Sequence, residues 1–112
     1  DYAIFTQDLE RRVTSWNVGA QRLLGFTEQE IVGHTGDVIF TPEDRAAKAP
    51  EKEARLARNE ERATDDRTHV RKDGSRFAAN GILMLMRNEG GEAIGFVKIL
   101  RDLSETLPKP DA

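Results

Sequence analysis

RFAANGILMLM (Arg76–Met86), the tip NEGG (Asn88–Gly91) and AIGFVKIL (Ala93–Leu100) form the stretch of sequence that decides the fold. Two apolar arms flank a tip of turn-forming residues. A tip with two glycines can supply the positive φ angles that reverse the chain between antiparallel strands. We therefore predict a long β-hairpin that extends from Arg76 to Ser104.

Both faces of this hairpin are apolar at the middle, because alternate side chains of a strand point to opposite sides of a sheet. One face can cover the core of a domain, so the other must meet a flanking helix, a partner chain or the rest of a longer protein. The first face holds Phe77, Ala79, Gly81, Leu83, Leu85, Phe96, Lys98 and Leu100. The second holds Ile82, Met84, Met86, Val97, Ile99 and Arg101.

Length and composition indicate one soluble domain. The chain has 112 residues, enough for a modest core, and a net charge of -3 with acids and bases interspersed. It contains no cysteine, which excludes disulfides, cysteine-ligated zinc and thiol nucleophiles and favours a reducing compartment. No apolar run approaches the roughly 20 residues that a bilayer-spanning helix needs. We expect a cytoplasmic domain that contacts neither nucleic acid nor membrane.

The rest of the chain alternates between strand and helix patterns. Their order predicts an α+β domain in which a block of helices covers one face of an antiparallel sheet. Because a strand begins almost at Asp1, we expect a domain excised from a longer protein, without its flanking segments. The predicted elements are strands at 2–6 and 12–16, short helices at 17–25 and 27–33, a helix start at Thr41-Pro42, a solvated helix from Glu51 to about Ala63, and a strand at 68–71.

Five short motifs occur in order along the chain: Ser15-Trp16-Asn17 with Ala20, Leu23, Leu24, Gly25 and Phe26; Glu30–Gly33; Phe40–Asp44; Arg71–Ser75; and Arg101–Glu105. Together, in this order and spacing, they make the chain resemble the PAS domain over nearly its full length. The closest resemblance is to PAS modules of bacterial sensor histidine kinases and chemotaxis-type signalling proteins. It implies a PAS fold, in which a five-stranded antiparallel sheet carries short helices and one longer helix on one face, around a small cavity. Residues 1–105 would form this domain and 106–112 a linker or tail.

The last of these motifs resembles the exit motif of the family, which implies a role in signal transmission. Asp102 can pair with a base from the neighbouring turn, either Arg71 or Lys72, and Ser104 can cap a helix that leaves the domain. Making or breaking that pair would move the output helix. The alternative is an ordinary ion pair at the end of the sheet, which contributes little to stability when it is exposed.

The resemblance places any ligand against the inward face of the sheet. If Lys98 points inward, it needs an anionic partner, because an unpaired buried ammonium is costly, and Glu53 is a candidate. Alternatively, Lys98 extends to the sheet edge. Ala79 and Gly81 either leave room for a ligand or let the helices pack closer. The pocket candidates are Trp16, Asn17, Glu53, Phe77, Ala79, Gly81, Leu83, Phe96, Lys98 and Leu100.

Two of these candidates have simpler alternatives. Trp16 either packs in the core or shields the edge of the cavity. Asn17 either ties the first hairpin to the first helix or only caps that helix.

No cofactor is predicted, although a small colourless ligand is compatible with the sequence. Haem needs an axial ligand, and the two histidines, His34 and His69, are both interpreted as exposed or hydrogen-bonded residues that bind no iron. The light-sensing flavin chemistry of the family needs a cysteine. Neither a catalytic constellation nor a metal-ligand cluster appears in the pattern, so we expect a domain without catalytic activity.

Two functions therefore fit the sequence. The first is a sensory or signal-transmitting module fused to a histidine kinase or similar output domain. The second is a ligand-free dimerisation module, in which the outer face at Ile82, Met84, Val97 and Ile99 forms a homodimer together with the missing flanking helices. A haem or flavin sensor is the third alternative.

Overall fold

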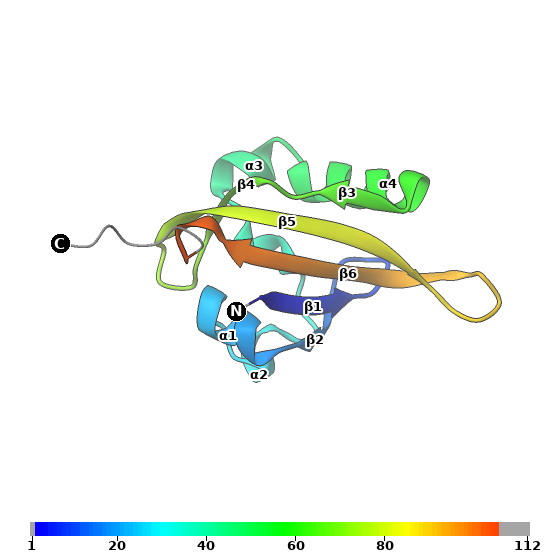
Figure 1. Cartoon of the computed structure of the whole chain (residues 1–112), viewed down its shortest axis with the longest axis horizontal. Helices are drawn as coiled ribbons and strands as arrows, with labels where there is room; N and C mark the ends of the chain where they lie inside the picture. The colour runs from blue at the N-terminus through cyan, green and yellow to red at the C-terminus, as the bar shows by residue number, and fades with distance from the viewer. Residues whose placement is uncertain (1, 106–112) are drawn as a thin grey trace.

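In the computed structural model, which describes residues 2–105, the predicted hairpin consists of β5 (Arg76–Arg87) and β6 (Ala93–Asp102). Its tip extends past the other elements (Figure 1). Of the two tip glycines only Gly91 has a positive φ, 83°. The N–H of Asn88 donates to the carbonyl of Glu92 at 2.9 Å and closes the turn. One left-handed residue is therefore sufficient to reverse the chain.

Four short strands complete the sheet within the described residues. The strand order is β2-β1-β6-β5-β3, and β4 also pairs with β5. The resemblance implied five strands; six are present because the segment beside β5 is split into β3 and β4 by Asp65 and Asp66. The short strands are β1 (Ala3–Gln7), β2 (Val13–Trp16), β3 (Arg62–Thr64) and β4 (Arg67–Val70).

The longer helix differs from its prediction at both ends. α4 (Ala49–Glu60) takes Pro50 into its first turn, and it ends where Glu61 adopts a left-handed φ of 74°. Ala63, predicted as the end of the helix, lies in β3 opposite Leu83 and is buried. No glycine follows the helix at this point, so the sequence carries no stop signal here and the predicted end lay too far along the chain.

The first two short helices begin at their predicted caps, and the first also ends at its predicted stop, whereas the second ends at Ile31, before the predicted stop at Gly33. Gly25 ends the first of them with a φ of 87°. Thr27 and Glu30 form the capping box that starts the second. The structure contains α1 (Val18–Leu24), α2 (Glu28–Ile31), the 3-10 turn η1 (Gly36–Ile39), α3 (Pro42–Ala46) and the 3-10 turn η2 (Leu103–Glu105). Within residues 2–105, none of the helices is both long and apolar enough for a bilayer.

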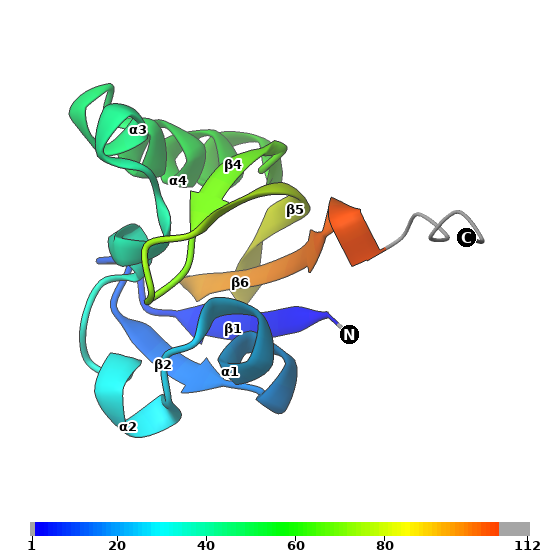
Figure 2. The same ribbon diagram turned by 90° about the vertical axis from the view of Figure 1, so that its left-hand side faces the viewer.

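The two faces of the sheet differ as the alternation predicts. α3 and α4 lie near β3, β4 and β5, whereas α1 and α2 lie near β1 and β2 (Figures 1 and 2). The inward residues Phe77, Leu83, Phe96 and Leu100 are buried beneath these helices. On the other face Ile82, Met84, Val97 and Ile99 are half-buried, and Ile4 beside them is 40% exposed.

Candidate functional site

A lysine lies at the middle of the covered face. Lys98 on β6 is only 2% exposed, and its ammonium donates to the carboxylates of Glu53 on α4 and Asp65 between β3 and β4. The inward orientation of Lys98 and its pairing with Glu53 are thus confirmed, and the alternative at the sheet edge is wrong. Two carboxylates hold the charge inside because an unpaired buried ammonium would be costly.

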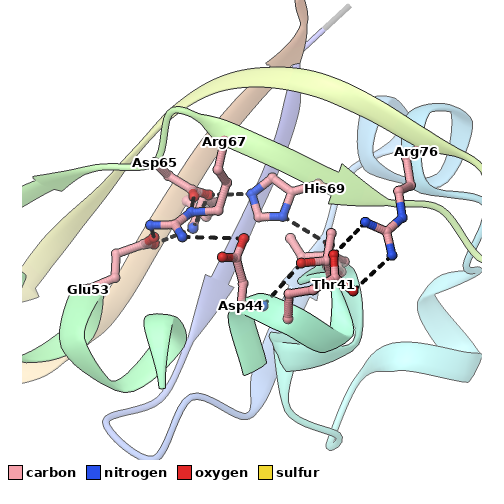
Figure 3. Close-up of polar contacts among 10 residues, drawn as sticks. Thr41, Asp44, Glu53, Asp65, Arg67, His69 and Arg76 are labelled. Carbon is pink, nitrogen blue, oxygen red and sulfur yellow. Dashed lines mark hydrogen bonds and ion pairs between the residues drawn. The ribbon is translucent and has the colours of Figure 1, made fainter. Parts of the chain in front are cut away.

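Asp65 is the hub of this cluster (Figure 3). Its Oδ1 accepts from Nε of Arg67 at 2.6 Å, and its Oδ2 accepts from Nε2 of His69 at 2.8 Å as well as from Lys98. We call Glu53, Asp65, Arg67, His69 and Lys98 the ionic cluster. It joins α4, β4, β6 and the link between β3 and β4.

His69 is fully buried, and both of its ring nitrogens face oxygen acceptors. Nδ1 lies 2.9 Å from the carbonyl of Ile39, and Nε2 lies 2.8 Å from Asp65. Because neither oxygen donates when Asp65 is ionised, both hydrogen bonds form only when the ring carries two protons. The interpretation of His69 as hydrogen-bonded is confirmed, and His34 is exposed in the turn after α2.

The two carboxylates of the cluster titrate differently. Burial raises the pKa of Glu53 to about 7; Lys98 opposes that increase, and the nearby Asp65 adds to it. Burial also acts to raise the pKa of Asp65, but the charge of Lys98 and the contact with His69 outweigh it and hold this pKa below its ordinary value. The surroundings therefore favour the ionised form of Asp65, whereas burial favours the protonated form of Glu53.

Two spaces adjoin Glu53. The inner one is a cavity of about 10 Å³, roughly the volume that one water molecule needs. It is lined by Gln7, Arg11, Asp37, Phe40, Pro50, Glu53, Leu83 and Lys98. The outer one is a groove of about 370 Å³ between α3, α4, β3 and β4, with Lys52, Leu56 and Thr64 exposed along it.

Three of the predicted pocket residues, Glu53, Leu83 and Lys98, line the cavity of about 10 Å³, and the others lie away from it. A side chain at Gly81 would meet Cδ1 of Leu100 at 2.7 Å and the carbonyl of Ile99 at 2.9 Å, so close packing and not open space explains this glycine. Trp16 packs in the core and donates from its indole to the carbonyl of Phe26 at 2.9 Å. The remaining core members are Phe77, Ala79, Phe96 and Leu100.

Asn17 has both of the roles considered for it and lies on the surface. Its Oδ1 accepts from the N–H of Ala20 at 2.7 Å, which caps α1, and from the N–H of Ile4 at 2.9 Å, which ties that helix to β1. Its Nδ2 donates to the carbonyl of Tyr2 at 3.2 Å.

The exit motif uses one of the two predicted bases. Nη2 of Arg71 donates to Oδ2 of Asp102 at 2.9 Å, and Nη1 donates to the carbonyl of Leu23 at 2.9 Å. Lys72 contacts Glu30 instead, so it is not the partner of Asp102. Asp102 itself is only 3% exposed, and the side chain of Arg71 is 27% exposed, so the ion pair at the end of the sheet is partly buried.

Ser104 depends on Asp102. Its hydroxyl and its N–H both donate to Oδ1 of Asp102, at 2.6 Å and 2.9 Å. Burial acts to raise the pKa of Asp102, but the hydrogen bonds from Arg71 and Ser104 outweigh it and lower that pKa. Asp102 therefore caps η2, while the helix that Ser104 was predicted to cap, like the predicted linker at 106–112, falls outside the described residues.

Comparison with known proteins identifies the fold and the family. A family model described as the PAS domain matches residues 1–105. The chain is a PAS domain. The resemblance and the α+β fold predicted from the sequence are both confirmed. A PAS domain is a sensory module, and the part of the chain that the structure describes holds no group of three His, Cys, Asp or Glu residues able to bind a metal.

Individual relatives cover the domain to different extents. "Two-component system protein A" of Emericella nidulans is 38% identical over 105 residues, which are 94% of this chain but 15% of that protein. A PAS domain from Colwellia psychrerythraea superposes with a TM-score of 0.84 at 21% identity, covering 93% of this chain and 87% of that one. The ethanol complex of a PAS domain from a LuxR-family regulator of Burkholderia thailandensis gives 0.74 at 17% identity, covering 92% and 89%.

Sequence analysis missed the hub of the ionic cluster. Asp65 and Arg67 lie in a polar run that was assigned to no site. Their signal is alternation: Asp65, Arg67 and His69 are two residues apart in an extended segment, so their side chains point to the same side. In this PAS domain that side faces the helices.

Proposed function

We propose that this PAS domain is the sensory and signal-transmitting module of a larger, cytoplasmic signalling protein, with an output such as a histidine kinase domain in the same chain. The relative from Emericella nidulans, named as a two-component system protein and far longer than this chain, supports that setting. The single observation that carries the proposal is the pair between half-buried Arg71 and buried Asp102.

This pair connects α1 and β5 with the exit of the chain at β6 and η2. Arg71 follows β4 and donates to α1 at Leu23, while its guanidinium lies 4.2 Å from the ring centroid of Phe77 on β5. Asp102 ends β6 and holds Ser104 in η2. A shift of the inner face of the sheet would therefore change the direction in which the chain leaves the domain.

The experiment is Asp102→Asn in the full-length protein, with output activity as the measurement. The substitution keeps the shape and removes the charge that holds Arg71, so we expect basal activity or its response to stimulus to change. Glu43→Gln is the matched control, because it removes an exposed ion pair with Arg76 away from the exit. Unchanged basal and stimulated activity in Asp102→Asn would contradict signal transmission through this pair.

A second function, dimerisation through the outer face, is supported by a different observation. Ile82 pairs with Ile99, and Met84 pairs with Val97, so their side chains form one contiguous apolar patch. Flanking helices from outside this chain would complete the interface of a homodimer. We expect Met84→Glu to dissociate a dimer in sedimentation, whereas Met86→Glu, farther toward the tip, should perturb it less. A dimer that persists in Met84→Glu would exclude this patch.

We also infer that the interior binds neither haem nor flavin. The cavity beside Lys98 holds about 10 Å³, and both nitrogens of His69 are hydrogen-bonded within the protein. The purified protein should be colourless, and a visible absorption band that copurifies with it would overturn this inference.

A further inference from the structure

Glu53 is the least satisfied member of the ionic cluster. Its side chain is 3% exposed, and no described residue donates a hydrogen bond to its Oε2. Nη2 of Arg67 lies 3.6 Å from that oxygen, beyond hydrogen-bond length. A buried carboxylate oxygen without a donor carries a desolvation penalty, which protonation of the group relieves.

Competition for Lys98 makes Glu53 the group that takes up the proton. Asp65 accepts hydrogen bonds from Lys98, His69 and Arg67, whereas Lys98 is the only described residue that donates to the side chain of Glu53. When two carboxylates share one cation in a buried site, the one with fewer donors is protonated first.

The charged groups around Glu53 come from every element packed against it. Lys98 approaches from β6, Asp65 from the link between β3 and β4, and Arg67 from β4. Asp44 of α3 reaches the cluster through Arg67 at 3.5 Å, and His69 reaches it through Asp65. Arg11 and Asp37 share the small cavity with Glu53, and Lys52 shares the groove.

A proton can reach this site from solvent. Glu53 lines both the solvent-facing groove and the cavity of about 10 Å³, which is large enough for one water molecule. The same cavity is too small for an organic ligand against Lys98. The chemical species that fits the site is therefore a proton, delivered through water.

We propose that Glu53 is a proton-binding site and that its protonation is a stimulus which this PAS domain detects. Protonation would remove the ionic contact between α4 and Lys98. Lys98, Leu100 and Asp102 alternate along the buried face of β6. The loss of the contact with Lys98 therefore occurs on the strand that ends at Asp102, the residue paired with Arg71. The proposal rests on the proposed signalling function and names its stimulus.

The direction of the pKa of Glu53 supports this site. Burial raises that pKa to about 7, so the charge of Glu53 would change within the range of pH found in cells.

The test is a pH titration of the 112-residue chain labelled with ¹³C at the glutamate carboxyls, followed by NMR. We expect one carboxyl to titrate with a midpoint of about 7, and that signal to be absent from Glu53→Gln. Glu51→Gln, on the same helix but half-exposed, should retain it. If no glutamate titrates above its ordinary pKa of 4.5, the proton site does not exist.

The second measurement, on the same samples, is the amide shift of Ser104. It should follow pH with the midpoint of Glu53 in the unmodified chain. In Glu53→Gln it should be independent of pH and match the low-pH position, because glutamine carries no charge. The proposal would be overturned if the amide shift of Ser104 did not change while Glu53 titrates. It would also be overturned if the pH-dependent shift of Ser104 persisted in Glu53→Gln and followed the signals of the His69 ring.

These outcomes are separable from the test of the signalling function. Suppose that Asp102→Asn changes the output activity but no carboxyl titrates near pH 7. The signalling function would then stand, and the proposal that protons are its stimulus would be wrong. If Glu53→Gln does not fold, as judged by Trp16 fluorescence, the titration of the unmodified chain alone decides whether the site exists.

Discussion

The covered face of the sheet has two halves that are built differently. The half under α1, α2 and η1 is packed by aliphatic and aromatic side chains such as Phe5, Leu24 and Ile39, all of which are fully buried. The half under α4 holds the ionic cluster beside a smaller apolar cluster, which consists of Ala54, Ala57, Ala63, Leu83 and Phe96. The same strands thus carry an apolar core at one end and a core that is partly apolar and partly ionic at the other.

This difference separates stability from function. Apolar burial stabilises by about 25 cal/mol per Å² of surface removed from water. A buried ion pair roughly breaks even, because desolvation of both charges offsets their attraction. The apolar half is therefore expected to hold the fold together, whereas the ionic half responds to changes in charge. Four predictions follow the contrast between these halves.

The largest effect is expected in the ionic half, for Asp65→Ala. Lys98, His69 and Arg67 would all lose an acceptor, and breaking a buried ionic contact costs about 3–5 kcal/mol in the free energy of unfolding. Urea denaturation measures it. Asp66→Ala is the matched control, because Asp66 is exposed. Equal losses for the two variants would refute the role of Asp65 as the hub.

A slightly smaller loss is expected in the apolar half, for Leu24→Ala. Truncation of a fully buried leucine costs about 2–5 kcal/mol through lost burial and the cavity left behind. Because no charge changes, the loss measured by urea denaturation should be the same at about pH 5 and about pH 8. A loss that varies strongly with pH would show that the two halves are coupled.

The pH dependence of stability should distinguish the halves further. Glu53 has a folded pKa of about 7 against an ordinary value of 4.5, so between these values the folded state binds more protons than the unfolded state. The contribution of Glu53 to the free energy of unfolding therefore decreases as the pH rises through this range. Asp65, with its lowered pKa, acts in the opposite direction but only at more acidic pH.

Glu53→Gln should remove that decrease, and Leu24→Ala should preserve it. The measurement is the midpoint of urea denaturation at several pH values for the three proteins. Parallel curves for the unmodified chain and Glu53→Gln would mean that Glu53 titrates alike in the folded and unfolded states.

The smallest effects are expected at the exit. Arg71→Met should cost about 1–3 kcal/mol, because it leaves the buried Asp102 without its cation. Lys72→Met should leave stability unchanged, since its contact with Glu30 is solvent-exposed. Thermal unfolding of the two variants measures both losses of stability. A larger loss for Lys72→Met than for Arg71→Met would contradict the assignment of Arg71 as the partner of Asp102.

Local patterns predicted most of the fold. The caps at Thr27 and Gly25 marked helix ends because capping depends on neighbouring residues alone. The pattern failed at Glu61, whose left-handed backbone has no sequence signature, and α4 was therefore predicted to extend into β3.

The sequence by itself determined which side chains share a face of the hairpin, because alternation along a strand follows from its local geometry. It also determined that Lys98 would need an acid if it turned inward. Only the tertiary structure decided that Asp65, 33 positions away, shares Lys98 with Glu53, and that Arg71 and not Lys72 holds Asp102. Those choices depend on distances between elements that are remote in the chain, and no local pattern encodes such distances.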